Sequence, residues 1–275
     1  MGQRRLPDRV ALGTMHGKET VIAPPLAGLG IAVVRADLDT DRFGTFAGDV
    51  PRAGDMRAAA RAKALAAASL TGLGVGLASE GAYGPHPTIP FLPFGRELLL
   101  WHDTQSGHEI IETLTDSQPN FDHETVQDPT AADGFLRRIG FPGTAVIVQS
   151  AAGAAPIAKG VTARDALDGA IRAALQASGT ALLQTDMRAH LNPRRMAMIG
   201  DLAQRLARRL ATPCPACNAP GFGHLRSLPG LPCGDCGTET GLIAADLQGC
   251  TLCGHETRIP RTGSADPAHC PSCNP

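Results

Sequence analysis

The chain has 275 residues, which is enough for one large domain and a small one. Its formal net charge is −1, so no overall field attracts it to nucleic acid or to membranes. No apolar run approaches the ~20 residues that a membrane-spanning helix needs, and nothing resembling a secretory signal precedes residue 30. We therefore expect a soluble, cytoplasmic protein with no membrane partner.

Apolar and β-branched runs predict strands that alternate with helices, as is typical of an α/β domain. The expected strands are residues 10–14, 31–36, 74–79, 97–102, 108–113, 144–149 and 181–185. The expected helices are a segment broken by Pro24-Pro25, then 55–68, 129–139, 162–177 and 193–210. Loops are expected at 37–54 and 82–95. This predicts an α/β domain over 1–211, with a mixed sheet and flanking helices, and a small zinc-ribbon-like module over 212–275.

Two helix starts have recognisable capping patterns. Asn192-Pro193 combines an N-cap residue with a proline at the first helical position. Thr162-Ala-Arg-Asp165 resembles a capping box. Each pattern predicts that a helix begins there.

All eight cysteines lie in the last quarter of the chain, as four Cys-x-x-Cys pairs. Such a turn places two thiolates on one side of a loop, and two turns complete a four-thiolate zinc site. Because a reducing compartment is expected, disulfides are disfavoured. The pairs predict two structural zinc ions, bound by Cys214, Cys217, Cys233, Cys236, Cys250, Cys253, Cys270 and Cys273.

The spacing leaves open which pairs share a zinc ion. Sequential pairing, first with second and third with fourth, would make two zinc ribbons in tandem. Interleaved pairing, first with third and second with fourth, would make one cross-braced module. We favour sequential pairing. A small polar residue or glycine follows each pair, which suits the positive φ of such turns; these are Asn218, Gly237, Gly254 and Asn274.

Two candidate ligand sites in the α/β domain follow expected strands, where such folds usually bind their ligands. Thr14, His16 and Lys18 lie in a strand-to-helix turn that could hold phosphate; a solvated loop is the alternative. Glu80 follows another strand and, with Asp55, could bind Mg²⁺ or Mn²⁺. Taken alone, Asp55 is better explained as a charge at a helix start.

The third candidate site lies between the last strand and the last helix. Arg188, Arg194 and Arg195 could bind phosphates through bidentate hydrogen bonds. A solvated surface cluster is the alternative.

The motifs of these sites resemble those of two known families, one over the whole chain and one over its first part. The whole chain resembles a bacterial domain family of unknown function, through Gly13–Glu19, Ala78–Pro85, Thr185–Pro193 and the terminal cysteine pairs. Residues 10–85 are also distantly similar to the inosine/xanthosine triphosphate pyrophosphatase superfamily. Thr14 and Lys18 match its first turn, residues 55–63 its alanine- and arginine-rich helix, and Glu80 its acidic metal ligand. Met15 replaces the asparagine of that superfamily, whose members generally lack a zinc tail.

The resemblance implies a metal-dependent nucleotide hydrolase that releases pyrophosphate from non-standard purine triphosphates. Glu80, Asp55 and Lys18 would then be catalytic, with Asp103 or Asp186 assisting at the metal. The alternative is a zinc-ribbon module that binds protein or nucleic acid on a non-catalytic α/β platform. Nucleic acid is the less favoured partner, because the cysteine-rich segment is not basic and has one aromatic residue, Phe222. Self-association through the tail, as a homodimer, is a third expectation.

Overall fold

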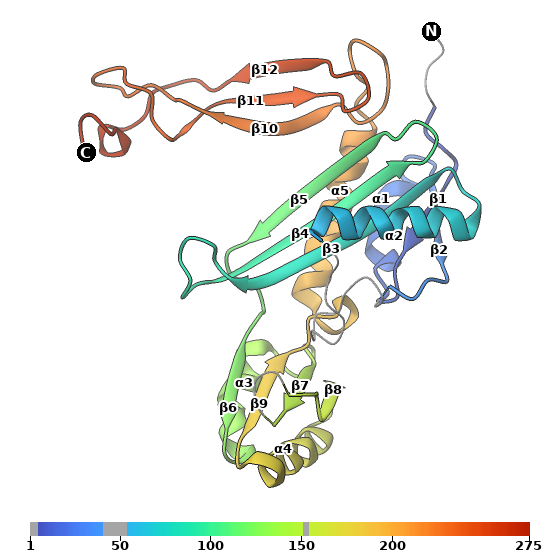
Figure 1. Cartoon of the computed structure of the whole chain (residues 1–275), viewed down its shortest axis with the longest axis vertical. Helices are drawn as coiled ribbons and strands as arrows, with labels where there is room; N and C mark the ends of the chain where they lie inside the picture. The colour runs from blue at the N-terminus through green and yellow to red at the C-terminus, as the bar shows by residue number, and fades with distance from the viewer. Residues whose placement is uncertain (1–4, 41–53, 151–153) are drawn as a thin grey trace. The chain divides into compact units, whose positions relative to one another are not determined.

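A computed structural model describes residues 5–40, 54–150 and 154–275 of the chain, so most of the loop expected at 37–54 lies outside it. The described chain forms two compact units. The larger unit contains Asp8–Gly107 and Ile111–Arg205, and the smaller contains Leu206–Pro275 with the short segment His108–Ile110. The mixed α/β architecture that the sequence predicts is confirmed (Figure 1).

The first sheet of the larger unit has the strand order β2-β1-β3-β4-β5. β1 lies parallel to both β2 and β3, while β3 and β4 are antiparallel. Two helices, α1 (Glu19–Ala27) and α2 (Met56–Thr71), connect the parallel strands. The strand bounds are β1 Arg9–Gly13, β2 Ala32–Ala36, β3 Val75–Pro85, β4 Pro93–Asp103 and β5 Glu109–Asp116.

Helix α2 packs closely on this sheet because small residues face each other across the interface. Ala60 and Ala64 of the helix pack with Ala78 of β3 in one buried cluster. A Cβ atom at Gly76 would collide with the carbonyl oxygen of Ala64, and one at Gly13 would lie 3.0 Å from the carbonyl oxygen of Lys63. The alanine run thus serves close packing as well as helix propensity.

The loop expected at 82–95 is shorter than predicted and covers residues 86–92, because β3 and β4 extend into it. The two strands pair continuously from Val75 opposite Asp103 to Pro85 opposite Pro93. Hydrogen bonds between β3 and β4 pair the backbone N–H and C=O groups of this glycine- and proline-rich segment. Both prolines lie at strand ends, where a missing N–H costs little.

The second sheet of the larger unit is antiparallel throughout, in the order β6-β9-β7-β8. Its core includes Phe135 from α3 and Leu167 and Ile171 from α4, all 0% exposed. The sequence did not predict β6 and β8, which are four-residue edge strands with charged residues. The bounds are β6 His123–Val126, α3 Asp133–Ile139, β7 Val146–Gln149, β8 Ala158–Val161, α4 Arg164–Ser178 and β9 Ala181–Thr185.

Helix α5 (Pro193–Leu210) begins where the sequence predicts. The side chain of Asn192 accepts a hydrogen bond from the backbone N–H of Arg195, 3.2 Å away. The capping box expected at residue 162 is wrong, since α4 begins after Ala163, which has no side-chain acceptor. Among the helices that the structure describes, none combines the length and apolar character required to cross a bilayer.

Helix α1 also differs from expectation, because it continues through Pro24 and Pro25. Ile22 and Leu26 are fully buried and anchor it. Each proline removes one backbone hydrogen bond, because positions 24 and 25 lie beyond the first turn, where an N–H would donate to the carbonyl oxygen four residues earlier. The helix ends soon after them, at Ala27.

In the smaller unit, three strands form an antiparallel meander (Figure 1). They are β10 Gly223–Pro229, β11 Ile243–Gly249 and β12 Glu256–Pro260. One Cys-x-x-Cys pair precedes β10, one lies in each turn, and one follows β12.

Candidate functional site

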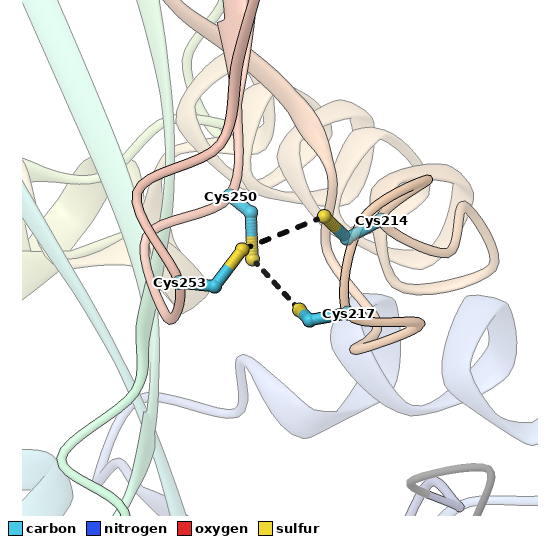
Figure 2. A group of neighbouring side chains, drawn as sticks. All are labelled: Cys214, Cys217, Cys250 and Cys253. Atoms are coloured by element: carbon cyan, nitrogen blue, oxygen red, sulfur yellow. Dashed lines mark hydrogen bonds between the residues drawn. The ribbon is translucent and has the colours of Figure 1, made fainter. Parts of the chain in front are cut away.

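The eight cysteines gather into two groups of four thiols, and the grouping is interleaved. Sequential pairing, which the sequence analysis favoured, is therefore wrong. In each group the four sulfur atoms lie within 4.8 Å of one another. The first pair joins the third, as Cys214, Cys217, Cys250 and Cys253, and the second joins the fourth, as Cys233, Cys236, Cys270 and Cys273 (Figure 2 shows the first group).

The meander explains this pairing. In an antiparallel meander alternate turns lie at the same end of the sheet, so the first and third pairs meet at one end and the second and fourth at the other. A seven-residue strand such as β10 separates the two ends by about 24 Å. Sequential pairing would have to join cysteines at opposite ends of the sheet across that distance.

The sulfur geometry fits zinc. Neighbouring sulfur atoms lie 3.8 Å apart in Cys214–Cys253, 3.7 Å in Cys217–Cys250 and 3.9 Å in Cys233–Cys273. A tetrahedron with Zn–S bonds of about 2.3 Å has edges of about 3.8 Å, whereas a disulfide would require about 2.05 Å. The two groups can therefore hold two structural metal ions, with zinc favoured by an all-thiolate set.

All four knuckles contain the same backbone turn. The residue after each second cysteine donates its N–H to the carbonyl oxygen of the first cysteine, at 2.8–3.0 Å. The positive φ expected after the pairs is confirmed at Asn218 (58°), Gly237 (74°) and Gly254 (75°), but Asn274 does not have it. At Cys236, hydrogen bonding with the side chain and the backbone of Thr238 lowers the thiol pKa to about 6, which favours the thiolate that binds metal.

The candidate ligand site of the larger unit lies just beyond the end of β1. β1 ends at Gly13, whereas its neighbour β3 continues to Pro85. Lys18, the residue before α1, is buried and donates to the backbone oxygen (3.3 Å) and the hydroxyl (2.9 Å) of Ser79 in β3. The turn 14–18 and the strand β3 thus meet here.

Arg195, at the start of α5, enters the same region. Its Nε donates to Glu97 Oε1, and another nitrogen donates to the backbone oxygen of Met187. The hydroxyl of Tyr83 donates to the same Glu97 oxygen at 2.8 Å, and the Arg195 guanidinium lies 5.6 Å from the Tyr83 ring centroid. Glu97 is fully buried, and no donor in the described residues reaches its second oxygen.

Glycine at position 81 makes room for this network. Gly81 faces Glu97 in the β3–β4 register. A Cβ there would collide with the Glu97 carboxylate and lie 2.8 Å from an Arg195 nitrogen. The glycine that follows Glu80 is therefore required by packing against a side chain.

Glu80 belongs to the opposite face of the sheet. It pairs in register with Leu98, one position away from the Gly81–Glu97 pair, so its side chain points toward α2. There it forms a buried ion pair with Lys63, a residue that the sequence analysis placed only within a matching helix.

Several predicted site residues lie in other arrangements. Asp55 accepts the backbone N–H of Ala58 (2.7 Å) as the exposed N-cap of α2, the simpler explanation that the sequence offered. Arg194 forms a bidentate pair with Asp116 (2.7 and 2.8 Å). Asp103 accepts two backbone N–H groups in the turn after β4.

At the rim of the site, Asp186 is fully buried and accepts three side-chain hydrogen bonds from Arg188. The rings of His16 and His190 stack, with centroids 5.2 Å apart. Arg188 and His190 therefore lie beside the 14–18 turn, a neighbourhood that their sequence positions did not reveal.

The electrostatics of the site are positive. Burial, then Lys18 and His190, lower the pKa of His16 to about 4, so its ring is neutral at pH 7. Burial and Arg195 lower the pKa of Lys18 to about 8, against the opposing effect of Glu97 and Glu80. Four cations (Lys18, Lys63, Arg195 and the partly buried Arg188) lie against three buried carboxylates (Glu80, Glu97 and Asp186), which leaves one excess positive charge.

The residues do not fit the magnesium or manganese site that the resemblance implies. Glu80 is paired with Lys63, and Asp55 caps a helix. In the described ranges, no three metal-ligating side chains gather apart from the cysteine groups. Mg²⁺ can bind through few protein carboxylates, but the two proposed here are not brought together.

The sequence analysis missed Ser79, Tyr83, Glu97 and Lys63 as members of the site. A weak signal existed for Glu97, which is a lone acid before the apolar run Leu98–Trp101. Its partner is 98 positions away, so no local pattern could identify the pair.

Comparison with known proteins gives a family but no activity. A family model described as "Domain of unknown function (DUF6671)" matches residues 63–275. No curated protein and no solved structure matches the chain. Neither result bears on the pyrophosphatase resemblance, which stays a prediction. The family match covers most of the chain, including the Lys63–Glu80 pair, Glu97, Arg195 and all eight cysteines, and the chain therefore belongs to the DUF6671 family of domains of unknown function.

Proposed function

We propose that the larger unit is a nucleotide hydrolase that binds the phosphates of its substrate beyond the end of β1. The observation that carries this proposal is the excess of positive charge around the buried Lys18. Burying charged groups is costly, and such clusters are characteristic of functional sites. An excess of cations favours an anionic ligand.

Local backbone geometry supports a phosphate ligand. Lys18 is the N-cap of α1 and provides no side-chain acceptor. The N–H groups of Thr20 and Val21 already donate to the carbonyl oxygens of Gly17 and Lys18, so the N–H groups at the start of the turn, those of Lys18 and Glu19, are the ones that can face a ligand. Gly17 has φ of 66°, which allows the tight turn before the helix. Helix N-termini that follow a strand and a glycine-containing turn commonly bind phosphate.

The roles follow from these positions. Lys18, Arg195 and the N-terminus of α1 hold the phosphates, and their charge stabilises the negative charge that develops when water attacks phosphorus. The neutral His16 ring offers a hydrogen bond, and Arg188 lies at the rim. The nucleoside triphosphate substrate, with a non-standard purine as first choice, is what the superfamily resemblance implies.

Two measurements test the proposal on the zinc-loaded full chain. Calorimetry would measure binding of tripolyphosphate and of inosine, xanthosine and standard nucleoside triphosphates, and a coupled assay would detect released pyrophosphate or phosphate. We expect Lys18→Met to abolish binding, because it removes the buried ammonium. Arg164→Met, on the exposed surface of α4, is the matched control and should bind normally.

Absence of both binding and turnover, from a folded protein that carries two zinc ions, would contradict the proposal. The zinc-containing module would then be the better candidate, as a surface that binds protein or nucleic acid.

A further inference from the structure

We propose that the stacked rings of His16 and His190 form a platform on which the nucleobase of the ligand lies, while its phosphates lie beside Lys18. This inference rests on the proposed function and deepens it, because it states how the site recognises a nucleotide. Cations and backbone N–H groups alone would accept any phosphorylated ligand. An aromatic platform beside them favours a ligand that also carries a flat ring.

The platform consists of two imidazole rings from different segments of the chain. His16 lies in the turn between β1 and α1, and His190 lies in the short 3₁₀ helix Ala189–Leu191 that follows β9. Their ring centroids are 5.2 Å apart and their planes are inclined by 23°, so the two rings stack. This separation falls within the range of about 4.5–7 Å that is usual for aromatic pairs.

The outer ring of the pair is accessible to a ligand. His190 is exposed, whereas His16 behind it is half-buried. One face of the His190 ring packs on His16, and the exposed ring can receive a base on its other face. Stacking on aromatic side chains, histidine included, is a common way for proteins to bind an unpaired base.

His190 lies directly beside the residue that precedes Lys18. A Cβ atom built on Gly17 would be 3.8 Å from the Cβ of His190. Because consecutive Cα atoms are about 3.8 Å apart, the His190 Cβ lies within about 9 Å of the Lys18 Cα. A ribose and one phosphate can span this distance. A base on the platform would therefore leave its phosphates near the start of α1.

The charge state of the rings suits a base better than a phosphate. Burial, followed by the charge of Lys18, lowers the pKa of His16 to about 4. Burial and Arg188 also lower the pKa of His190, against the opposing effect of Asp186. Two rings that are mainly neutral at pH 7 stack without repulsion, and they add no charge that would hold a phosphate. They suit the uncharged part of a nucleotide.

The first test compares inosine triphosphate with tripolyphosphate, which has no base, by calorimetry on the zinc-loaded full chain. We expect the nucleotide to bind about 5- to 100-fold more tightly, the range that base stacking provides. His190→Ala should remove this advantage and leave the tripolyphosphate affinity unchanged, whereas His190→Phe, which keeps a flat ring, should retain it. His123→Ala, at an exposed histidine of β6, is the matched control and should behave as the wild type.

Proton NMR of the bound nucleotide reports stacking itself. The ring current of an aromatic side chain shifts the H2 and H8 protons of a stacked purine upfield. We expect this shift with the wild type and with His190→Phe, and a smaller one with His190→Ala. An equal nucleotide advantage in the wild type and His190→Ala would overturn the inference and leave the proposed function intact. Absence of tripolyphosphate binding by the wild type would instead remove the proposed function, and this inference with it.

Discussion

The two units differ in how their candidate sites are encoded. In the smaller unit each half-site is four residues long, and its chemistry can be read from the Cys-x-x-Cys spacing. In the larger unit Lys18 meets Ser79 across 61 positions, and Arg195 meets Glu97 across 98. Local spacing is therefore enough to identify the cysteines as metal ligands. A buried charge network, in contrast, exists only once the chain is folded.

The cysteine groups also show that a sequence can reveal what kind of ligand a residue is without revealing which other residues complete its site. The spacing correctly predicts groups of thiols that can hold metal ions, but not which pairs combine. The meander decides that, because it brings alternate knuckles to the same end. Even the site most visible in the sequence thus depends on tertiary structure for its completion.

The largest expected effect is the loss of zinc. Structural zinc contributes about 10–16 kcal/mol in small domains, so its removal should unfold the β10–β12 meander. Elemental analysis should find two zinc ions per chain, and far-UV circular dichroism should change when a strong chelator removes them.

Paired serine variants test the interleaved grouping. Cys217→Ser with Cys253→Ser should cost one zinc ion, because both residues serve the first group. Cys217→Ser with Cys236→Ser should cost both ions. Elemental analysis distinguishes the two proteins, and the reverse result would restore sequential pairing.

The next largest effect is expected in the buried network. Glu97→Ala leaves the Arg195 charge buried and unpaired, which should destabilise the larger unit by about 3–5 kcal/mol. Trp101, the only tryptophan of the chain and a buried residue of β4, reports urea unfolding of this unit by fluorescence.

The matched control is Asp116→Ala, which removes the partner of Arg194, a side chain 51% exposed. Exposed pairs contribute at most about 1 kcal/mol. Equal losses in the two variants would mean that the Glu97–Arg195 pair is not shielded from solvent as described.

A smaller effect is expected at Gly81. Gly81→Ala places a methyl group against Glu97 and Arg195 and should cost about 1–3 kcal/mol by overpacking. Gly84→Ala, in the same strand, meets no atom within 4 Å and should stay within about 0.5 kcal/mol. Trp101 unfolding curves compare the two, and equal stability would contradict the close packing around Gly81.

The smallest effect is a pH dependence of ligand binding. Anion binding needs the protonated ammonium of Lys18, whose pKa is lowered to about 8. As pH rises from 7 to 9 the charged form is lost, so phosphate affinity should fall by up to about tenfold. Calorimetry on Arg188→Met measures the effect of Lys18 ionisation when a neighbouring cation is removed. The fall of phosphate affinity with pH should be as steep in this variant as in the wild type. A flat profile in both proteins would show that Lys18 does not contact the ligand.

Much of the fold follows from local sequence. β9, α5 and its Asn192 cap match their predicted positions. In these segments the periodicity of apolar residues, the capping residue and the burial of side chains all indicate the same element. The sequence analysis missed the extension of β3 and β4 because cross-strand pairing stabilises it. The strand propensities of glycine and proline do not reveal such pairing. The edge strands β6 and β8 were missed for a similar reason.

The sequence alone determined the α/β class, the turn that holds Lys18, and that the cysteine pairs can form thiol groups suited to metal. The tertiary structure decided which knuckles pair, and that Glu80 faces Lys63 while Glu97 faces Arg195. The physical reason is the range of the interactions. Turns and helix caps depend on residues a few positions apart, whereas pairing across a sheet and the burial of charge depend on chain segments that meet only on folding.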